Sequence, residues 1–406
     1  MTRNPSSART ARRNSGFGLV EIMVGVVIGF IAVLVIYQVY NVAEGFKRNT
    51  TAAGEAQIAG LFSTFVLGME ISNGGAAMAV SATDLASCTD TGNIATSFRP
   101  IPVLITSGGA AGTPDSFVVT YSVASTLSTP SMFNFDANAD DDYHIQSPNG
   151  FHVGDLIVAI ANPGGVGTDC ASSVVTNVSA PDLRVPPPLI NDTPTNVADV
   201  TIKHSATGSA AALRGDGRPG LSTLFNMGPC NKVQKVRYDV SNGVLRATPL
   251  LDMSSDPTKC GKLLDPAVAN PVASNIVNMK VEYGIDSDGD PLGLLDTWVQ
   301  ASDVGWDPAT LLPAPITTIN QIKAIRIGLI IQSEQFDKTL ADYTGGDYNV
   351  GAYNWVLFDC PQVNKALCPG RLTGSVPQSL APKGNWRFRK YETVIPLRNE
   401  IWNKAS

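Results

Sequence analysis

An apolar run near the N-terminus constrains this chain more than any other feature. Across residues 19–40 the only charged side chain is Glu21. At about 1.5 Å of rise per residue, a helix over this run is about 33 Å long, which is enough to cross a bilayer. The preceding segment contains Arg3, Arg9, Arg12 and Arg13 and no acid. The positive-inside rule therefore places the N-terminus in the cytoplasm and everything after residue 40 on the far side.

The apolar run differs from a conventional secretory signal. Such a signal has a shorter apolar core, followed by a cleavage site with small residues. Here the run is long, and its end is marked by the polar residues Gln38, Asn41 and Glu44 and not by small ones. We therefore expect processing before the helix, at Ser15-Gly16-Phe17, where the basic leader meets the apolar run.

The segment Gly16-Phe17-Gly18-Leu19-Val20-Glu21-Ile22-Met23-Val24 resembles the leader junction of type IV prepilins and of type II secretion pseudopilins. The resemblance implies that a membrane peptidase cuts after Gly16 and methylates the new N-terminus at Phe17. The family more often has Thr or Ser where this chain has Gly18. This departure leaves Gly16, Phe17 and Glu21 in place.

Glu21 gives the resemblance a physical meaning. A carboxylate in a membrane helix costs about 2.5–3.5 kcal/mol on insertion scales, so it needs a partner. The resemblance implies that this partner is the free α-amino group of a neighbouring subunit in a filament. The alternative is a glutamate near the membrane edge that reaches water by itself.

The helical pattern continues beyond the membrane. Large apolar residues recur at three- and four-residue spacing and form an amphipathic face: Ile58, Leu61, Phe62, Phe65, Val66 and Met69. Small residues that allow close packing lie between them: Ala52, Ala53, Gly54, Ala56, Ala59 and Gly60. Asn73-Gly74-Gly75 is a plausible stop. A helix over 17–72 is about 84 Å long, so its outer half is expected to lie against a head domain.

The remainder of the chain is predicted to be rich in β-strands. Residues 74–223 are rich in Gly, Ala, Ser, Thr, Asn and Pro, and 116–123 and 155–160 are their clearest strands. From residue 224 the pattern tightens, with two β-prone runs flanking the hairpin signal Asn242-Gly243. Further strand-like runs cover 275–284 and 387–397, while 319–332 reads as helix or strand and ends in a buried strand.

These patterns predict an α+β fold in which a long N-terminal helix packs on an antiparallel β-sheet head. The expected parts follow along the chain: a leader (1–16), a long helix (17–73, with 17–40 in the membrane), a variable β region (74–223) and a C-terminal β-rich pilin head region (224–406).

Short segments of the C-terminal half are similar to PilW-type minor pilins. They are Leu224-Phe225-Asn226-Met227-Gly228, Val236-Arg237-Tyr238, Ile325-Arg326-Ile327-Gly328-Leu329 and Tyr391-Glu392-Thr393-Val394-Ile395-Pro396-Leu397-Arg398-Asn399. The similarity spans residues 224–399 and narrows the resemblance from pilins in general to this type.

Six cysteines favour disulfides, because the chain has no C-x-x-C motif and its body lies in an oxidising space. They are Cys88, Cys170, Cys230, Cys260, Cys360 and Cys368. Six cysteines allow fifteen pairings. Pairing neighbours in order would join 88 to 170, 230 to 260 and 360 to 368, and buried free thiols are the alternative.

Other chemistry is sparse in the sequence. The formal charge is −6 and no cluster of Lys or Arg follows Arg13, which argues against nucleic-acid binding. The three histidines are too few and too scattered for a metal triad or a catalytic triad, so no enzyme activity is predicted. Asp286, Asp288 and Asp290 occupy alternate positions with Asp296 beyond, in the manner of a calcium loop, with a solvated acidic turn as the alternative.

The resemblance implies a minor pilin, an assembly, priming or tip subunit that enters a type IV pilus through its N-terminal helix. Implied partners are other minor pilins, the major pilin, the prepilin peptidase, the inner-membrane assembly platform, a tip adhesin and membrane lipid. The protein would sit in the inner membrane with a periplasmic body before it moves to the pilus fibre or tip. The alternatives are a type II secretion pseudopilin, a membrane-anchored periplasmic enzyme or binding protein, and an adhesin that binds through 74–223.

Overall fold

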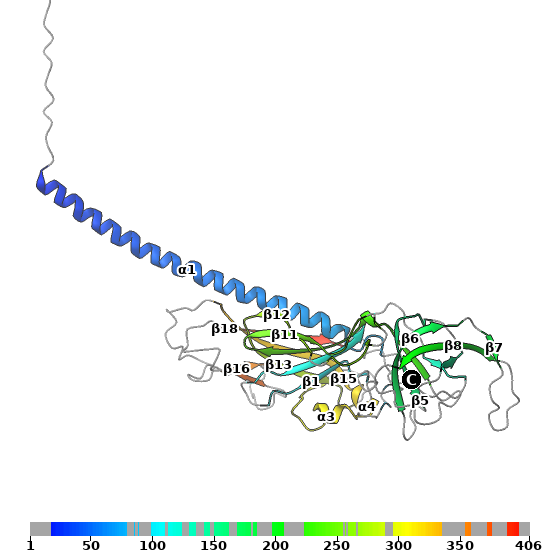
Figure 1. Ribbon diagram of the computed structural model, residues 1–406. Helices are drawn as coiled ribbons and strands as arrows, with labels where there is room; N and C mark the ends of the chain where they lie inside the picture. The colour runs from blue at the N-terminus through cyan, green and yellow to red at the C-terminus, as the bar shows by residue number, and fades with distance from the viewer. Residues whose placement is uncertain are drawn as a thin grey trace, which may run out of the picture. The chain divides into compact units, whose positions relative to one another are not determined.

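The computed structural model describes residues 18–78, 85, 88, 99–109, 113–123, 130–134, 142–146, 150–161, 169–179, 182–184, 197–206, 223–254, 256, 259–264, 267–288, 295–334, 354–358, 372–375 and 388–397. The chain divides into two compact units, residues 1–54 and 55–406. One long helix and several antiparallel sheets make up the described part (Figure 1). This agrees with the predicted α+β class.

The long helix α1 covers Leu19–Asn73. It ends at the predicted stop, where Gly75 adopts a positive φ of 76°. The adjacent Gly74 also needs its lack of a side chain, because a Cβ there would lie 2.9 Å from the carbonyl oxygen of Pro102. The left-handed backbone at Gly75 and the close packing at Gly74 therefore end the helix together.

Within the second unit, α1 packs on the head through a face of mostly small residues. Ala56, Gly60 and Ser63 are buried on this face, and Leu67 and Ile71 complete it further along the helix. A Cβ on Gly60 would lie 2.3 Å from Cε2 of Tyr391, so glycine is what lets the tyrosine ring contact the helix. The predicted packing of the helix on a β-sheet head is confirmed.

The first sheet has the strand order β1-β2-β10-β11-β12 and is antiparallel throughout. Its strands are β1 (Val103–Thr106), β2 (Ser116–Ser122), β10 (Val233–Ser241), β11 (Val244–Pro249) and β12 (Asn270–Ser274). The predicted hairpin turn joins β10 to β11, and both Asn242 and Gly243 have positive φ, as a tight two-residue hairpin turn requires.

The second sheet has the order β14-β13-β15-β18. Its strands are β13 (Ile276–Ile285), β14 (Thr297–Gln300), β15 (Ile322–Gln332) and β18 (Phe388–Pro396). The predicted runs at 275–284 and 387–397 are therefore strands. The ambiguous run 319–332 is the end of the short helix α4 (Ile316–Ile319) followed by β15, while α3 (Pro308–Leu311) precedes both.

One apolar core joins α1 to these two sheets. Leu67 and Ile71 of the helix share it with Phe117 of β2 and with Val281 and Tyr283 of β13. The Tyr283 hydroxyl accepts a hydrogen bond from the backbone N–H of Ile105 at 2.6 Å. Both sheets thus bury their alternating apolar faces in the same cluster.

A separate seven-stranded sheet has the order β3-β9-β5-β6-β8-β4, with β7 paired to β8. Its strands are β3 (Ser131–Met132), β4 (Tyr143–Ile145), β5 (Asp155–Ala161), β6 (Asp169–Val178), β7 (Asp182–Arg184), β8 (Val197–Ala206) and β9 (Thr223–Pro229). The Asn134 N–H donates to the His144 carbonyl at 2.8 Å and Phe133 bridges Ile145, so β3 and β4 close the order into a barrel.

The barrel sheet is apolar on both faces. Ile157 and Ala159 of β5 point into the barrel, where Phe133 and Tyr143 lie. The alternate residues of the same strand, Leu156, Val158 and Ile160, belong to another cluster that also contains the four cysteines named below. The short pair β16 (Asn354–Leu357) and β17 (Leu372–Ser375) and the 3-10 turn η3 (Cys230–Lys232) complete the described elements.

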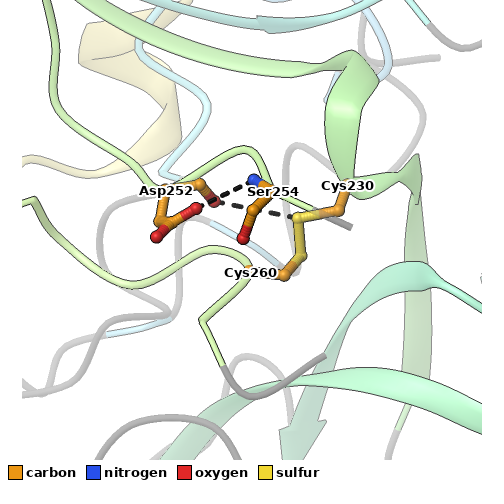
Figure 2. The surroundings of a disulfide bond; sticks show 4 residues. All are labelled: Cys230, Asp252, Ser254 and Cys260. Atoms are coloured by element: carbon orange, nitrogen blue, oxygen red, sulfur yellow. Dashed lines mark hydrogen bonds between the residues drawn. A yellow bond between two sulfur atoms is a disulfide. The ribbon is translucent and has the colours of Figure 1, made fainter. Parts of the chain in front are cut away.

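Two disulfides lie in that outer cluster. They join Cys88 to Cys170 and Cys230 to Cys260, which are two of the three pairs given by order along the chain. Figure 2 shows the second, with the Cys230 sulfur 3.8 Å from the carbonyl oxygen of Asp252. Ser254 donates its N–H to the Asp252 carboxylate at 2.8 Å, which shapes the turn beside the bond. Cys360 and Cys368 lie outside the described residues.

Candidate assembly surface and cation site

The membrane end of α1 is the first candidate site. The N–H groups of Glu21 and Ile22 donate to the Gly18 carbonyl at 2.9 and 3.2 Å, so the helix starts directly after the predicted junction. Glu21 lies in its first turn, where a carboxylate is favourable for the helix dipole. Gly16 and Phe17 lie outside the described residues. The helix is long and apolar enough to cross a membrane.

The head-proximal part of α1 carries a second surface. Ile58, Leu61, Phe62, Phe65 and Met69 are between 49% and 70% exposed. We refer to these five residues as the outer stripe. They lie on the helix face opposite the small residues that contact the head. The amphipathic pattern in the sequence is therefore real, but the head takes the small face and leaves the large apolar face exposed.

A polar contact fixes the end of the helix to the first sheet. The Tyr121 hydroxyl donates to Oε2 of Glu70 at 2.7 Å. Burial first, and the Glu70 carboxylate second, raise the pKa of the Tyr121 hydroxyl; burial and Glu70 also raise the pKa of Tyr238. Both phenols therefore stay protonated and can donate hydrogen bonds to the Glu70 carboxylate. These contacts fix the end of α1, which carries the outer stripe, to the first sheet.

The predicted acidic loop follows β13. Carboxylate oxygens of Asp286, Asp288 and Asp296 lie within 4.8 Å of one another. Asp286 is buried and the other two are exposed. Ser287 donates both its N–H (2.9 Å) and its hydroxyl (2.8 Å) to Oδ2 of Asp296. Asp290 lies outside the described residues.

Hydrogen bonds from Ser287 lower the pKa of Asp296, so this carboxylate stays ionised at neutral pH. Converging carboxylate oxygens are what Ca²⁺ prefers, and calcium binding here stays a prediction. We expect Ca²⁺ to bind with a dissociation constant of about 10⁻⁴–10⁻³ M, as in extracellular modules. Titration calorimetry with Ca²⁺ checks this, and Asp296→Asn should remove the heat signal. Equal heats for the wild type and the variant would contradict it.

The polar face of β13 holds a buried ion pair that the sequence analysis did not single out. Glu282 is fully buried, and its Oε2 accepts from the guanidinium of Arg326 on β15. The Arg326 guanidinium carbon lies 4.5 Å from the ring centre of Trp298 and 4.4 Å from that of Phe358. The guanidinium of Arg326 on β15 therefore contacts side chains from β13, from β14 and from the loop that contains Phe358.

Glu282 predicts a pH dependence of stability. Burial raises the pKa of this carboxyl to about 7 although Arg326 opposes the shift, with smaller contributions from Asp303 and Asp115. The folded protein thus keeps a proton that the unfolded chain releases near its ordinary pKa, so stability falls as pH rises from about 4 to about 7. The total loss is about 3 kcal/mol.

Thermal melting at several pH values checks this expectation. Glu282→Gln carries no titrating proton at this position, so it should flatten the profile and melt above the wild type at pH 8. The exposed Glu334→Gln is the control and should leave the profile unchanged. A wild type that gains stability over the same pH interval would contradict the argument.

The three histidines lie in or beside the barrel. Nδ1 of His144 is 2.8 Å from Oδ2 of Asp199, and the ring of His204 stacks on Tyr143 with centroids 4.0 Å apart. Nδ1 of His152 lies 3.7 Å from Oδ2 of Asp155. Each histidine thus has its own local partner, and among the described residues they form no shared metal centre.

The comparisons with known proteins add two matches. Residues 238–399 match the family model PilW, described as type IV pilus-assembly protein W, and residues 11–37 match the prokaryotic N-terminal methylation motif. No curated protein and no solved structure matches the chain. The first match runs from β10 to the end of β18, and the second contains Gly16, Phe17 and Glu21. Strands β3 to β9 lie outside both.

Proposed function

The chain belongs to the PilW family of type IV pilus-assembly proteins, and we propose that this minor pilin enters the pilus through α1 after its leader is removed at Gly16. It is a structural pilus protein and not an enzyme. The observation that carries the proposal is the exposed outer stripe on the head-proximal part of the membrane helix. A plain membrane anchor has no use for a large apolar face beyond the bilayer.

The proposed mechanism has two parts. Glu21 pairs with the free amino group of a neighbouring subunit, which balances two charges in an apolar setting. The outer stripe then packs against an apolar helix of a neighbouring pilin, burying surface at about 25 cal/mol per Å². The charge pair sets the register, and apolar burial supplies most of the affinity.

Partners and location follow at two levels of detail. The pilus machinery and the prepilin peptidase are partners, and the protein is a membrane-anchored pilin destined for the pilus. We further propose that its neighbours are the major pilin and other minor pilins, and that its body is periplasmic before assembly. A position near the tip is supported by the barrel, a module outside the family model.

Two other assignments are less well supported. A type II secretion pseudopilin shares the methylation motif, but the match over 238–399 is to a pilus-assembly family. A plain anchor for a periplasmic binding protein predicts an uncut N-terminus and tolerance of changes at Glu21.

Glu21→Ala tests the proposal in cells. We expect normal membrane levels and normal leader removal, with the protein lost from sheared pili by at least tenfold. Immunoblots of membrane and sheared fractions, with intact-mass analysis of the N-terminus, provide the readouts. Glu44→Ala is the matched control, since Glu44 lies on the same helix and pairs with Arg48 at 3.0 Å on the helix surface. Equal incorporation of both variants would contradict the proposal.

A further inference from the structure

Lys280 and Asp115 form a buried pair that the proposed assembly function does not use. Nζ of Lys280 lies 3.0 Å from Oδ1 of Asp115, and each side chain is only 5% exposed. We infer that these two side chains condense into an intramolecular isopeptide bond, which makes the pair a covalent modification site of the mature head.

Asp115 is held against the strand that carries Lys280. Its backbone N–H donates to the Met279 carbonyl at 2.8 Å, and its Oδ2 accepts from the Val281 N–H at 3.1 Å. Asp115 is thus fixed to the residues on both sides of Lys280, through its backbone N–H on one side and its carboxylate on the other. Asp115 can reach this edge of β13 because β14 pairs only with residues 282–285 of that strand.

Lys280 is fixed as well. Its ammonium donates to the carbonyl oxygen of Thr113 at 2.9 Å, two residues before Asp115. The Gly108 N–H donates to Oδ1 of Asp115 at 2.8 Å. Amine and carboxyl are therefore held in contact, and such fixed placement removes most of the entropic barrier to a reaction between them.

The reaction runs through the neutral lysine amine, which is a nucleophile. Two N–H donors, from Gly108 and Val281, already point at the carboxyl oxygens and would stabilise the negative charge of a tetrahedral intermediate.

A third group is available to carry protons. Glu282 lies two residues along β13 from Lys280, on the same face of the strand, and is fully buried. Because burial raises its pKa to about 7, a large share of Glu282 is protonated at neutral pH. A carboxyl with this pKa serves equally well as proton donor and acceptor.

The reaction balances without any further reactant. The Lys280 ammonium passes one proton to the Asp115 carboxylate, which gives an amine and a carboxylic acid. The nitrogen lone pair attacks Cγ of Asp115 and forms the C–N bond. A second proton leaves nitrogen, through the Glu282 carboxyl, for the hydroxyl group, the C–O bond breaks and water departs. Nothing is oxidised or reduced, and Glu282 ends as it began.

The bond would close a long loop of the chain that contains the barrel. Asp115 and Lys280 are 165 positions apart, and β2 to β12, including every barrel strand, lie between them. Tension that enters the barrel would then reach the second sheet through a covalent link rather than through hydrogen bonds alone.

Mass spectrometry of the full-length, reduced protein from its native host tests the inference. We expect the wild type to be lighter by one water molecule than its processed sequence, and trypsin to leave the bond after Lys280 uncut. Lys280→Arg keeps the positive charge but should show the full mass. Asp115→Asn should lose ammonia in place of water, because an amide then supplies the leaving group.

Glu282→Gln keeps the shape but removes the proton carrier. In pulse-labelled protein it should slow bond formation by about 100-fold or more, the usual contribution of a positioned acid or base. A wild type of full mass that trypsin cuts after Lys280 would overturn the inference and leave a plain ion pair. Water loss that persists in Lys280→Arg would also overturn it. The wild-type mass decides the question even if a variant fails to fold.

Discussion

The double variant Phe62→Ser/Phe65→Ser is expected to be absent from pili while its head remains folded. The two rings are 49% and 68% exposed in the isolated subunit, so their loss costs the head little. In the fibre each ring would be buried, and removing each would cost about 1.5–3 kcal/mol of contact energy. Two such losses correspond to a fall in incorporation of at least a hundredfold.

Sheared-pilus immunoblots and thermal melting of the same variant give the two readouts. Leu67→Ala is the opposite control, because Leu67 is fully buried against the sheets. It should lower the stability of the head by about 2–5 kcal/mol. Normal incorporation of the double serine variant would show that the outer stripe does not contact neighbouring pilins.

Removing the two disulfides found among the described residues is expected to have the largest effect on stability. They close loops of 82 and 30 residues, and each bond contributes about 2–5 kcal/mol by restricting the unfolded chain. Cys88→Ser/Cys170→Ser should lose somewhat more than Cys230→Ser/Cys260→Ser, because its loop is longer. A variant that lacks both bonds is expected to be degraded in cells before it is assembled.

Denaturant unfolding of the two paired variants measures these losses. Single serine variants serve as a control for thiol exchange, since each leaves one free partner. A stability loss below about 1 kcal/mol for both pairs would mean that packing in the shared cluster, and not the covalent links, holds this region.

Local signals in the sequence were sufficient to predict much of the fold. The turn at Asn242 and Gly243 needs positive φ at both positions, and few residues tolerate this, so the hairpin was predictable. The helix stop before Gly75 was predictable for the same reason, because Gly75 also has a positive φ. The closed barrel was not predictable, because its closure depends on pairs such as Phe133 with Ile145 that no local pattern reveals.

The boundary predicted between the variable β region (74–223) and the C-terminal head region (224–406) does not match how the strands pair. Strand β9 begins at Thr223 and pairs with β3 and β5, so the last barrel strand lies in the part assigned to the C-terminal head. In the other direction, β1 and β2 precede the boundary but pair with β10 in the first sheet. Sheet membership depends on distant partners, which composition does not record.

The alternating pattern of β13 predicted a strand but not the buried polar contacts that it makes. Its polar positions suggest a solvated face, yet all ten residues of the strand are buried. Lys280 and Glu282 are accommodated because Asp115 and Arg326 reach them from other elements. The acidic loop was predicted from spacing, and Asp296 joins it by folding back from a position beyond the loop.

The pairing of Ser122 with Val233 has a consequence for how such a protein diversifies. Everything between these two residues leaves and rejoins the sheet at adjacent positions, as the tip of an ordinary hairpin does. A lineage can therefore enlarge or replace residues 123–232 without disturbing hydrogen bonds in the strands on either side, as long as Cys170 and Cys230 keep their bonds to Cys88 and Cys260 outside this segment. The scaffold that assembles and the inserted strands can then evolve at separate rates.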